Sequence, residues 1–375
     1  MKHHPLKLTL ISGVIFLASI TNAHAAASPT VSSYTFTDLG TLYGGISSVG
    51  YSLNNMNQVA GSGENSSGQT QAILWNGTMA TDLGNLTGRY VSSGAGINKD
   101  GLVAGSSTYY GGGQATVWNG SVATNLGTFP GGYNSIGAGI NNGGQVAGSS
   151  DGNGFVQHAT LWNGLTPTDL GILSSGSFSV GQGINNVGQV VGYGDIASGQ
   201  YHAILWNGTK VTDLSNGNYS AAYSINDASQ VVGYSVAASG QQHATLWNGT
   251  IATDLGTLSG GSFSSAAGIN KVSQVAGWSN DAYGQQRATL WNGTIATDLN
   301  SFLSQSTVNA GWILSAANAI NDFGSITGSA YNSKTNAAHA FLLSAVSPIP
   351  EPSTYIMFLV GLGVIGFTVR RKLVI

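Results

Sequence analysis

The sequence HATLWNGTIATDLG at residues 243–256 returns almost unchanged as RATLWNGTIATDLN at residues 287–300. Apolar residues flank Asn-Gly on both sides in each copy. Asn-Gly is the strongest short signal for a two-residue hairpin turn with positive φ at both positions. Each copy therefore predicts two antiparallel strands, ATLW and TIATDL, joined by a turn centred on Asn-Gly.

Trp-Asn-Gly recurs along the chain at spacings of 41 to 44 residues, and two other marks recur in step with it. The six copies begin at Trp75, Trp118, Trp162, Trp206, Trp247 and Trp291. A DLG-type mark falls at Asp38, Asp82, Asn125, Asp169, Asp213, Asp254 and Asp298, and a GIN-type mark at Asn54, Asn98, Asn141, Asn185, Asn226, Asn270 and Asn321. This period is typical of a propeller blade with four strands. Because both marks count to seven, the sequence predicts seven blades.

The repeat that starts near Ser264 shows the four strands. SSAAGIN is a strand of small residues, QVAGWS follows after a short turn, and ATLW and TIATDL complete the set. Small residues suit the strand nearest the axis, where the blades converge. The Trp at the end of the third strand, ATLW, can fill the wider gap between neighbouring blades further out. The six tryptophans of the Trp-Asn-Gly copies, which we call the Trp ring, are therefore interpreted as structural.

The two ends of the repeat array are complementary. The first strand, Tyr34–Gly40, is a fourth strand without the three before it, and the last repeat ends in HAFLLSAV without a fourth strand. A closed ring predicts this pattern, since the N-terminal strand then completes the last blade and hides both edges. We therefore expect an all-β chain with one seven-bladed propeller over residues 34–345. An open solenoid gives no reason for the complementarity.

The stretch HAFLL at His339–Leu343, together with the DLG and GIN marks, resembles the HAF repeats of bacterial extracellular proteins. The resemblance covers residues 34–345 and implies an extracellular location but no established activity. The first position of this motif varies along the chain: His158, His202, His243, His339, Gln71, Gln114 and Arg287. Such variation argues against a catalytic group, and we expect these side chains to hydrogen-bond a neighbouring loop or strand.

Composition excludes several classes of function. Only 7% of the 375 residues are charged, the net charge is −3, and there are 56 glycines and no cysteines. No basic stripe is present for nucleic acid. Without cysteine there are no disulfides, no thiolate catalysis and no Cys-ligated metal, and the histidines lack the close spacing of a metal site. We expect neither a metal nor a cofactor.

The N-terminal residues 1–25 have a basic start, an apolar run and a small-residue end, which is the pattern of a secretory signal. Cleavage is expected after Ala25, with Ala27 as the alternative site, and export through the Sec machinery follows from this assignment. A retained membrane anchor is the competing interpretation.

The C-terminal segment has three parts in a fixed order: a linker with a Pro-Glu-Pro motif over 346–354, an apolar stretch that we expect to form a transmembrane helix, and a basic tail, the last two over 355–375. This order resembles the PEP-CTERM sorting signal, carried here by Pro350, Glu351, Pro352, Arg370 and Arg371. The resemblance implies recognition and cleavage by an exosortase in a Gram-negative bacterium, with transient anchoring in the inner membrane before processing. A plain C-terminal anchor is the alternative.

Most of the fourteen acidic residues belong to the repeat marks or to the turns beside them. Four others lie in loops between the second and third strands of different blades: Glu64, Asp151, Asp195 and Asp281. A glycosidase needs two carboxylates within ~5–10 Å of each other, and nothing in the sequence brings these four together. We therefore expect no enzyme, with a propeller glycoside hydrolase or polysaccharide lyase as the alternative.

An aromatic residue precedes most GIN-type marks by seven or eight positions, in the loop that joins consecutive blades. The set is Tyr90, Tyr133, Phe178, Tyr219 and Phe263, with Ile46 in the first blade and Trp312 as a looser match in the last. These loops emerge on the same propeller face as the four isolated carboxylates. Aromatic rings and polar groups around one mouth suit stacking against sugar rings. The competing interpretation is that the aromatics plug gaps between blades.

These patterns predict an exported, cell-surface or matrix-associated repeat protein that binds extracellular polysaccharide or serves as a structural module of a biofilm layer. A pure filler without any ligand is a further alternative.

Overall fold

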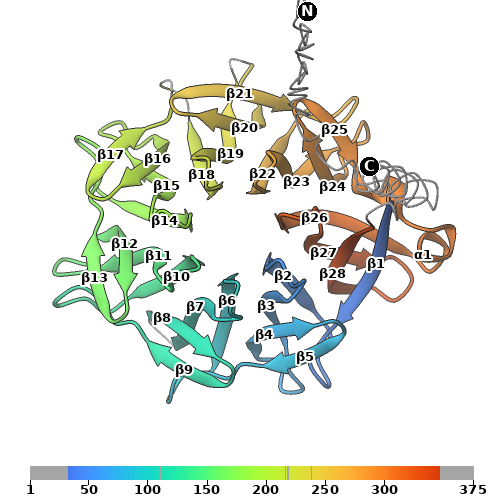
Figure 1. Cartoon of the computed structure of the whole chain (residues 1–375), viewed down its shortest axis with the longest axis horizontal. Coiled ribbons are helices and arrows are strands. Elements are labelled where there is room, and N and C mark those ends of the chain that lie inside the picture. The colour runs from blue at the N-terminus through green and yellow to red at the C-terminus, as the bar shows by residue number, and fades with distance from the viewer. Residues whose placement is uncertain (1–32, 110–111, 216, 218, 238, 347–375) are drawn as a thin grey trace, which may run out of the picture. The chain divides into compact units, whose positions relative to one another are not determined.

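The computed structural model describes residues 33–109, 112–215, 217, 219–237 and 239–346. Within them, 28 strands form seven antiparallel sheets of four strands each, and Figure 1 shows these sheets arranged around a ring as the blades of a propeller. The predicted all-β, seven-bladed fold is confirmed.

Each of blades 1 to 6 is one continuous run of four strands, in sequence order from the axis to the rim (Figure 1). Blade 1 is β2 (Ser48–Leu53), β3 (Val59–Glu64), β4 (Thr70–Asn76) and β5 (Met79–Asp82). Blade 2 is β6 (Val91–Ile97), β7 (Val103–Tyr109), β8 (Gly112–Asn119) and β9 (Val122–Asn125). Blade 3 is β10 (Ser135–Ile140), β11 (Val146–Asp151), β12 (Gln157–Asn163) and β13 (Thr166–Asp169).

The next three blades follow the same scheme. Blade 4 is β14 (Ser179–Ile184), β15 (Val190–Asp195), β16 (Tyr201–Asn207) and β17 (Lys210–Asp213). Blade 5 is β18 (Ser220–Ile225), β19 (Gln230–Val236), β20 (Gln242–Asn248) and β21 (Ile251–Gly256). Blade 6 is β22 (Ser264–Ile269), β23 (Gln274–Asn280), β24 (Gln286–Asn292) and β25 (Ile295–Asp298). A 3₁₀ helix, η1 (Leu299–Phe302), and a short helix, α1 (Gln305–Asn309), lead into blade 7.

Blade 7 joins the two ends of the described chain. It consists of β26 (Trp312–Ile320), β27 (Ile326–Asn332), β28 (Ala337–Val346) and, as its outer strand, β1 (Ser33–Gly40), so the blue and red ends of the ribbon lie side by side in Figure 1. The pairing runs from Ser33↔Val346 to Gly40↔Ala340. The Asp38 carboxylate contacts His339 Nδ1 at 2.9 Å. The predicted closure by the N-terminal strand is therefore confirmed.

The alternation of strands sorts the loops onto two faces. The upper face carries the loops between blades and those between the second and third strands, and the lower face carries the turns between the first and second strands and between the third and outer strands. The sequence correctly placed the aromatic loops and the carboxylate loops on one face, which is the upper one.

The turn in the outer hairpins differs from the prediction. Asn76 pairs with Met79, so Gly77 and Thr78 are the two central residues. φ is +61° at Gly77 and is not positive at Asn76 or Thr78. The expectation of positive φ at both Asn and Gly was wrong, because Asn is the last residue of its strand. Gly at the first central position is the arrangement of a type II′ turn.

The six tryptophans of the Trp-Asn-Gly copies are each at most 1% exposed. Trp206 of blade 4 packs against Ala147, Ala159 and Leu170 of blade 3, so the indole fills the space between two blades. In blade 7, Leu343 pairs with Ile326 in the place where Trp206 pairs with Val190. The structural interpretation of the Trp ring is confirmed.

A glycine in each second strand lets the first strand approach closely. A Cβ at Gly192 would lie 1.9 Å from the carbonyl oxygen of Val180, and a β-bulge shifts the register of this strand pair between Gly181 and Gly183. No side chain fits at such a distance, so this position requires glycine.

The asparagines of the GIN-type marks form a closed ring on the lower face. Each Nδ2 donates to the backbone carbonyl of the equivalent asparagine in the next blade, at 3.0–3.3 Å, and Asn321 closes the ring by donating to Asn54. Each Oδ1 accepts backbone N–H groups of its own turn, as Asn54 does from Met56 and Gln58. All seven are buried. The mark that revealed the repeat therefore also links neighbouring blades.

Candidate functional site

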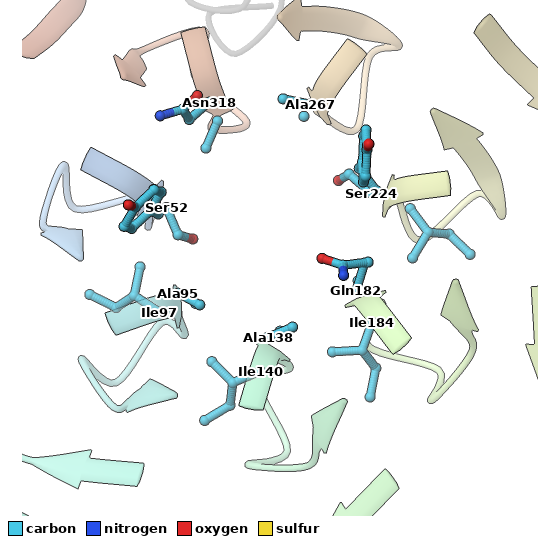
Figure 2. A pocket seen from close by; sticks show the side chains of 18 of the residues that line it. Ser52, Ala95, Ile97, Ala138, Ile140, Gln182, Ile184, Ser224, Ala267 and Asn318 are labelled. Atoms are coloured by element: carbon cyan, nitrogen blue, oxygen red, sulfur yellow. The ribbon is translucent and has the colours of Figure 1, made fainter. Parts of the chain in front are cut away.

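The axis of the propeller holds a central channel. The inner strands of all seven blades line a cavity of about 200 Å³, seen along the axis in Figure 2. Its polar side chains include those of Gln182, Tyr223 and Asn318, and below them lies a ring of Leu53 and isoleucines such as Ile140. Among the described residues, its lining contains no carboxylate and no histidine, and its titratable side chains are the phenols of Tyr51 and Tyr223.

Two of the four predicted carboxylates hold the loops that carry the aromatics. Asp151 is 3% exposed, and its Oδ1 accepts the backbone N–H groups of Tyr133 and Asn134, both at 2.7 Å. Asp195 accepts N–H from Ser177 and Phe178 at 2.6 and 2.9 Å and the Ser177 hydroxyl at 2.5 Å. These carboxylates therefore position Tyr133 and Phe178.

The pKa of Asp195 reflects these contacts. Burial by itself would raise the pKa, but the hydrogen bonds from Ser177 and Phe178 outweigh burial and leave the pKa below its usual value. Hydrogen bonds to the ionised form act in this direction. Asp195 is therefore ionised at neutral pH and is unsuited to act as a general acid.

The predicted loop position holds for Asp281 alone, because Glu64, Asp151 and Asp195 are each the last residue of a second strand. Asp281 accepts the backbone N–H groups of Tyr283 and Gln285 at 2.9 Å and Nε of Arg287 at 3.0 Å. Glu64 is half-buried at the end of β3, and its backbone N–H donates to the carbonyl of Ser47. The four carboxylates thus belong to four different blades, and three of them are engaged with neighbouring loop groups.

The predicted aromatics lie on the upper face, and three of them are open to solvent. Tyr90 is 51% exposed, Tyr133 65% and Phe263 43%, whereas Phe178 and Tyr219 are half-buried. A side chain that plugs a gap between blades would be buried, so the plug interpretation does not describe the three exposed rings.

Tyr90 and Tyr133 each have an aromatic neighbour that sequence reasoning missed. Tyr90 lies 5.4 Å from Tyr109 between ring centroids, and the two rings border a groove of about 670 Å³ where blade 1 meets blade 2. Tyr133 stacks on Phe155 at 5.5 Å, with 20° between the ring planes. Tyr109 is the last residue of the second strand of blade 2, and Phe155 lies in the loop after the second strand of blade 3. Both positions are outside the repeated marks.

A larger aromatic cluster spans blades 4 and 5. We call it the tyrosine cluster, and it consists of Phe178, Tyr193, Tyr201, Tyr219, Tyr223 and Tyr234. Tyr201 of blade 4 lies 5.2 Å from Tyr219 of blade 5, and Tyr223 lines the central channel. The cluster therefore runs from the upper loops to the axis.

Burial shapes the chemistry of this cluster. It raises the pKa of Tyr223 to about 12 and is also the main cause of the raised pKa of Tyr193, Tyr219 and Tyr234, with smaller contributions from neighbouring tyrosines. These phenols are therefore neutral at physiological pH. A neutral phenol both donates and accepts hydrogen bonds.

The variable position of the third strand makes three kinds of contact, one of which is the bond from Arg287 to Asp281 in the preceding loop. Where it is His, Nδ1 contacts the aspartate of the outer strand in the same blade, as in His158–Asp169 at 2.8 Å and His202–Asp213 at 2.8 Å. Where it is Gln, Nε2 donates to the carbonyl of the aromatic in the next blade: Gln71 to Tyr90 at 3.0 Å and Gln114 to Tyr133 at 2.7 Å. The predicted hydrogen bonding to a neighbouring strand or loop is confirmed.

Residues 348–372 match the PEP-CTERM protein-sorting motif, which confirms the resemblance carried by Pro350, Glu351, Pro352, Arg370 and Arg371. The motif indicates export to the cell surface in Gram-negative bacteria and processing by an exosortase. These residues, the signal ending at Ala25 and the predicted transmembrane helix all lie outside the described residues. Within the described ranges, no helix has the length and apolar character that crossing a membrane requires.

Solved structures resemble the chain at the level of the fold alone. The β-propeller domain of the Trilobed protease from Pyrococcus furiosus is 10% identical over 67% of this chain and 83% of its own, with a TM-score of 0.43. A gluconolactonase from Xanthomonas campestris is 10% identical over 86% and 93%, with a TM-score of 0.42. A lectin from Aleuria aurantia is 13% identical over 68% and 95%, with a TM-score of 0.39. No curated protein sequence matches the chain.

Proposed function

We propose that this exported propeller is a non-catalytic module of a cell-surface or biofilm matrix, built from HAF repeats, that binds neutral polysaccharide through its upper face. The observation that carries the proposal is the exposure of Tyr90, Tyr133 and Phe263 on that face. Exposed rings lose water on binding and stack against the apolar faces of sugars, with neighbouring polar groups fixing orientation.

The groove between blades 1 and 2 illustrates how a sugar would be held. Tyr90 and Tyr109 supply ring surface, while Gln69, Thr70 and Thr108 place amide and hydroxyl groups along the same groove. Its volume of about 670 Å³ lies within the range of small-molecule sites. Because Gln71 donates a hydrogen bond to the carbonyl of Tyr90, the backbone at Tyr90 is held in place before a ligand binds.

The preference for a neutral chain follows from charge. Acidic side chains outnumber basic ones on the upper face, where Glu64, Asp82 and Asp281 are examples. An acidic polysaccharide would meet repulsion there. A neutral one meets neutral phenols and amides.

Two features support a binding module over the hydrolase or lyase alternative. Asp151, Asp195 and Asp281 on the upper face accept backbone N–H groups of loops, as Asp151 does from Tyr133. The His–Asp pairs occur once per blade in four blades, which is the distribution of a structural repeat rather than of a single catalytic centre.

A glycan array, followed by prolonged incubation of each bound glycan with the protein, tests the proposal. We expect neutral oligosaccharides to bind and to keep their length when analysed by mass spectrometry. Shortened products would establish the enzymatic alternative, and a blank array would favour a structural module without a glycan ligand.

A further inference from the structure

The lower face carries a second set of exposed apolar side chains, and these are mainly aliphatic. Five outer hairpins each hold one such residue at or just after the turn, 63–72% exposed: Met79, Val122, Leu165, Ile251 and Ile295. We call these five residues the rim aliphatics. The turns nearer the axis add Met56, Val187 and Phe323, 60–69% exposed. In the remaining described hairpin, Lys210 takes the position that Met79 has in blade 1.

The two faces therefore expose different chemistry. Highly exposed rings gather on the upper face, as at Tyr43, Tyr133 and Tyr283, while highly exposed aliphatic side chains are concentrated on the lower one, with Ile46 as the exception on the upper face. Aliphatic side chains offer no flat surface for a sugar ring, but they partition readily into the boundary between lipid headgroups and acyl chains. The lower face thus has the chemistry of a lipid contact rather than of a glycan contact.

The two faces also differ in their balance of acidic and basic side chains. The lower turns carry three lysines and three aspartates: Lys99, Lys210, Lys271, Asp100, Asp227 and Asp322. The other charged side chains of the described residues lie towards the upper face, and they are three cations against ten carboxylates. Membranes that contain anionic lipid repel acidic surfaces. A balanced lower face is therefore the side that such a membrane tolerates.

The chain leaves the propeller on the lower face. Ser33 and Val346 pair with each other at the lower ends of β1 and β28. Only residues 347–354 separate Val346 from the apolar stretch of the sorting motif, which begins at Tyr355. Eight residues span at most about 29 Å when fully extended. While the apolar stretch is in the membrane, this short tether keeps the exit face close to the bilayer.

We propose that, before the sorting motif is processed, the lower face lies against the phospholipid bilayer with the rim aliphatics at the headgroup–acyl boundary, which leaves the upper face pointing away from the membrane. The ring of hairpins gives several small insertions around one plane, and Lys210 supplies a cation for the headgroups. The proposal does not depend on glycan binding by the upper face.

The absence of cysteine allows each face to carry one unique fluorescent label. Ile251→Cys and Ile295→Cys place an environment-sensitive dye on the lower face, and Tyr43→Cys and Tyr283→Cys provide matched, exposed apolar positions on the upper face. The full chain is reconstituted in vesicles of phosphatidylethanolamine and phosphatidylglycerol, with and without acyl-chain brominated lipid as a quencher. In vesicles without brominated lipid, we expect the emission of a dye at either lower position to shift to the blue. In vesicles with brominated lipid, that emission should be quenched. A dye at either upper position should show the same emission in both.

Equal responses from the two faces would overturn the proposal, as would lower-face labels that brominated lipid does not quench. Protection of those labels from aqueous iodide without quenching by brominated lipid would identify a second copy of the chain as the cover and would also overturn it. A second measurement uses the Ile251→Cys label in a variant that also carries Met79→Ser, Val122→Ser and Ile295→Ser. In this variant, brominated lipid should no longer quench the dye. Unchanged quenching in that variant would mean that the rim aliphatics do not make the contact.

Discussion

Deleting Tyr34–Gly40 is expected to destabilise the whole propeller, including blades far from the N-terminus. The deletion removes the outer strand of blade 7, the buried side chains of Tyr34 and Leu39 and the contact between Asp38 and His339. It also exposes the edge of β28. Losing two buried side chains and one strand pairing should lower the free energy of unfolding by about 5 kcal/mol or more. The melting temperature should fall by on the order of 10 °C.

Thermal unfolding followed by circular dichroism provides the measurement, and the variant Asp38→Asn serves as its control. That substitution keeps the strand and weakens one side-chain contact, so it should cost far less than the deletion. A deleted protein that melts at the temperature of the intact one would mean that the strand contributes nothing to closing the ring.

Replacing Trp162 by alanine is expected to destabilise the propeller strongly. The side chain is fully buried and packs against Ala104, Leu126 and Val146 between blades 2 and 3. Its Nε1 makes no hydrogen bond, so the loss is one of packing. Truncating a buried Trp costs about 3–5 kcal/mol, to be measured by denaturant unfolding.

Two further variants make this prediction specific. Trp162→Leu should recover part of the loss, because Leu343 fills the equivalent place in blade 7. Trp278→Ala, at a half-buried position outside the Trp-Asn-Gly marks, should cost clearly less. If Trp162→Ala and Trp278→Ala were equally mild, the Trp ring would not be what holds neighbouring blades together.

The fold was predictable because its evidence is repetitive. Each blade restates the positions of its turns and its buried Trp, so errors at one position are corrected by the others. The turn geometry was missed because Asn76 and Gly77 read as a turn pair in isolation, whereas the pairing of Asn76 with Met79 makes Asn76 the end of a strand. Register depends on the partner strand, which a local motif does not contain.

The candidate site was predictable only in outline. The period placed Tyr90 and Tyr133 on one face, but their neighbours Tyr109 and Phe155 occur once each and have no repeated position to reveal them. The role of Asp151 was equally hidden, since its contact with the backbone of Tyr133 joins residues 18 apart across two loops. Non-repeated, non-local contacts carry no signal in a single sequence.

Binding of isolated exopolysaccharide to the protein and to Tyr90→Ala, Tyr133→Ala and Tyr219→Ala tests the central claim most directly, with Phe323→Ala on the lower face as an exposed aromatic control. Stacking on a sugar contributes on the order of 1 kcal/mol per ring, so each upper-face variant should bind about fivefold more weakly. Because Tyr133 is exposed, Tyr133→Ala should change the melting temperature little. The control Phe323→Ala should bind the polysaccharide as tightly as the intact protein does. Unchanged affinity in all three upper-face variants, with melting temperatures lowered by several degrees, would contradict the account and make these rings structural.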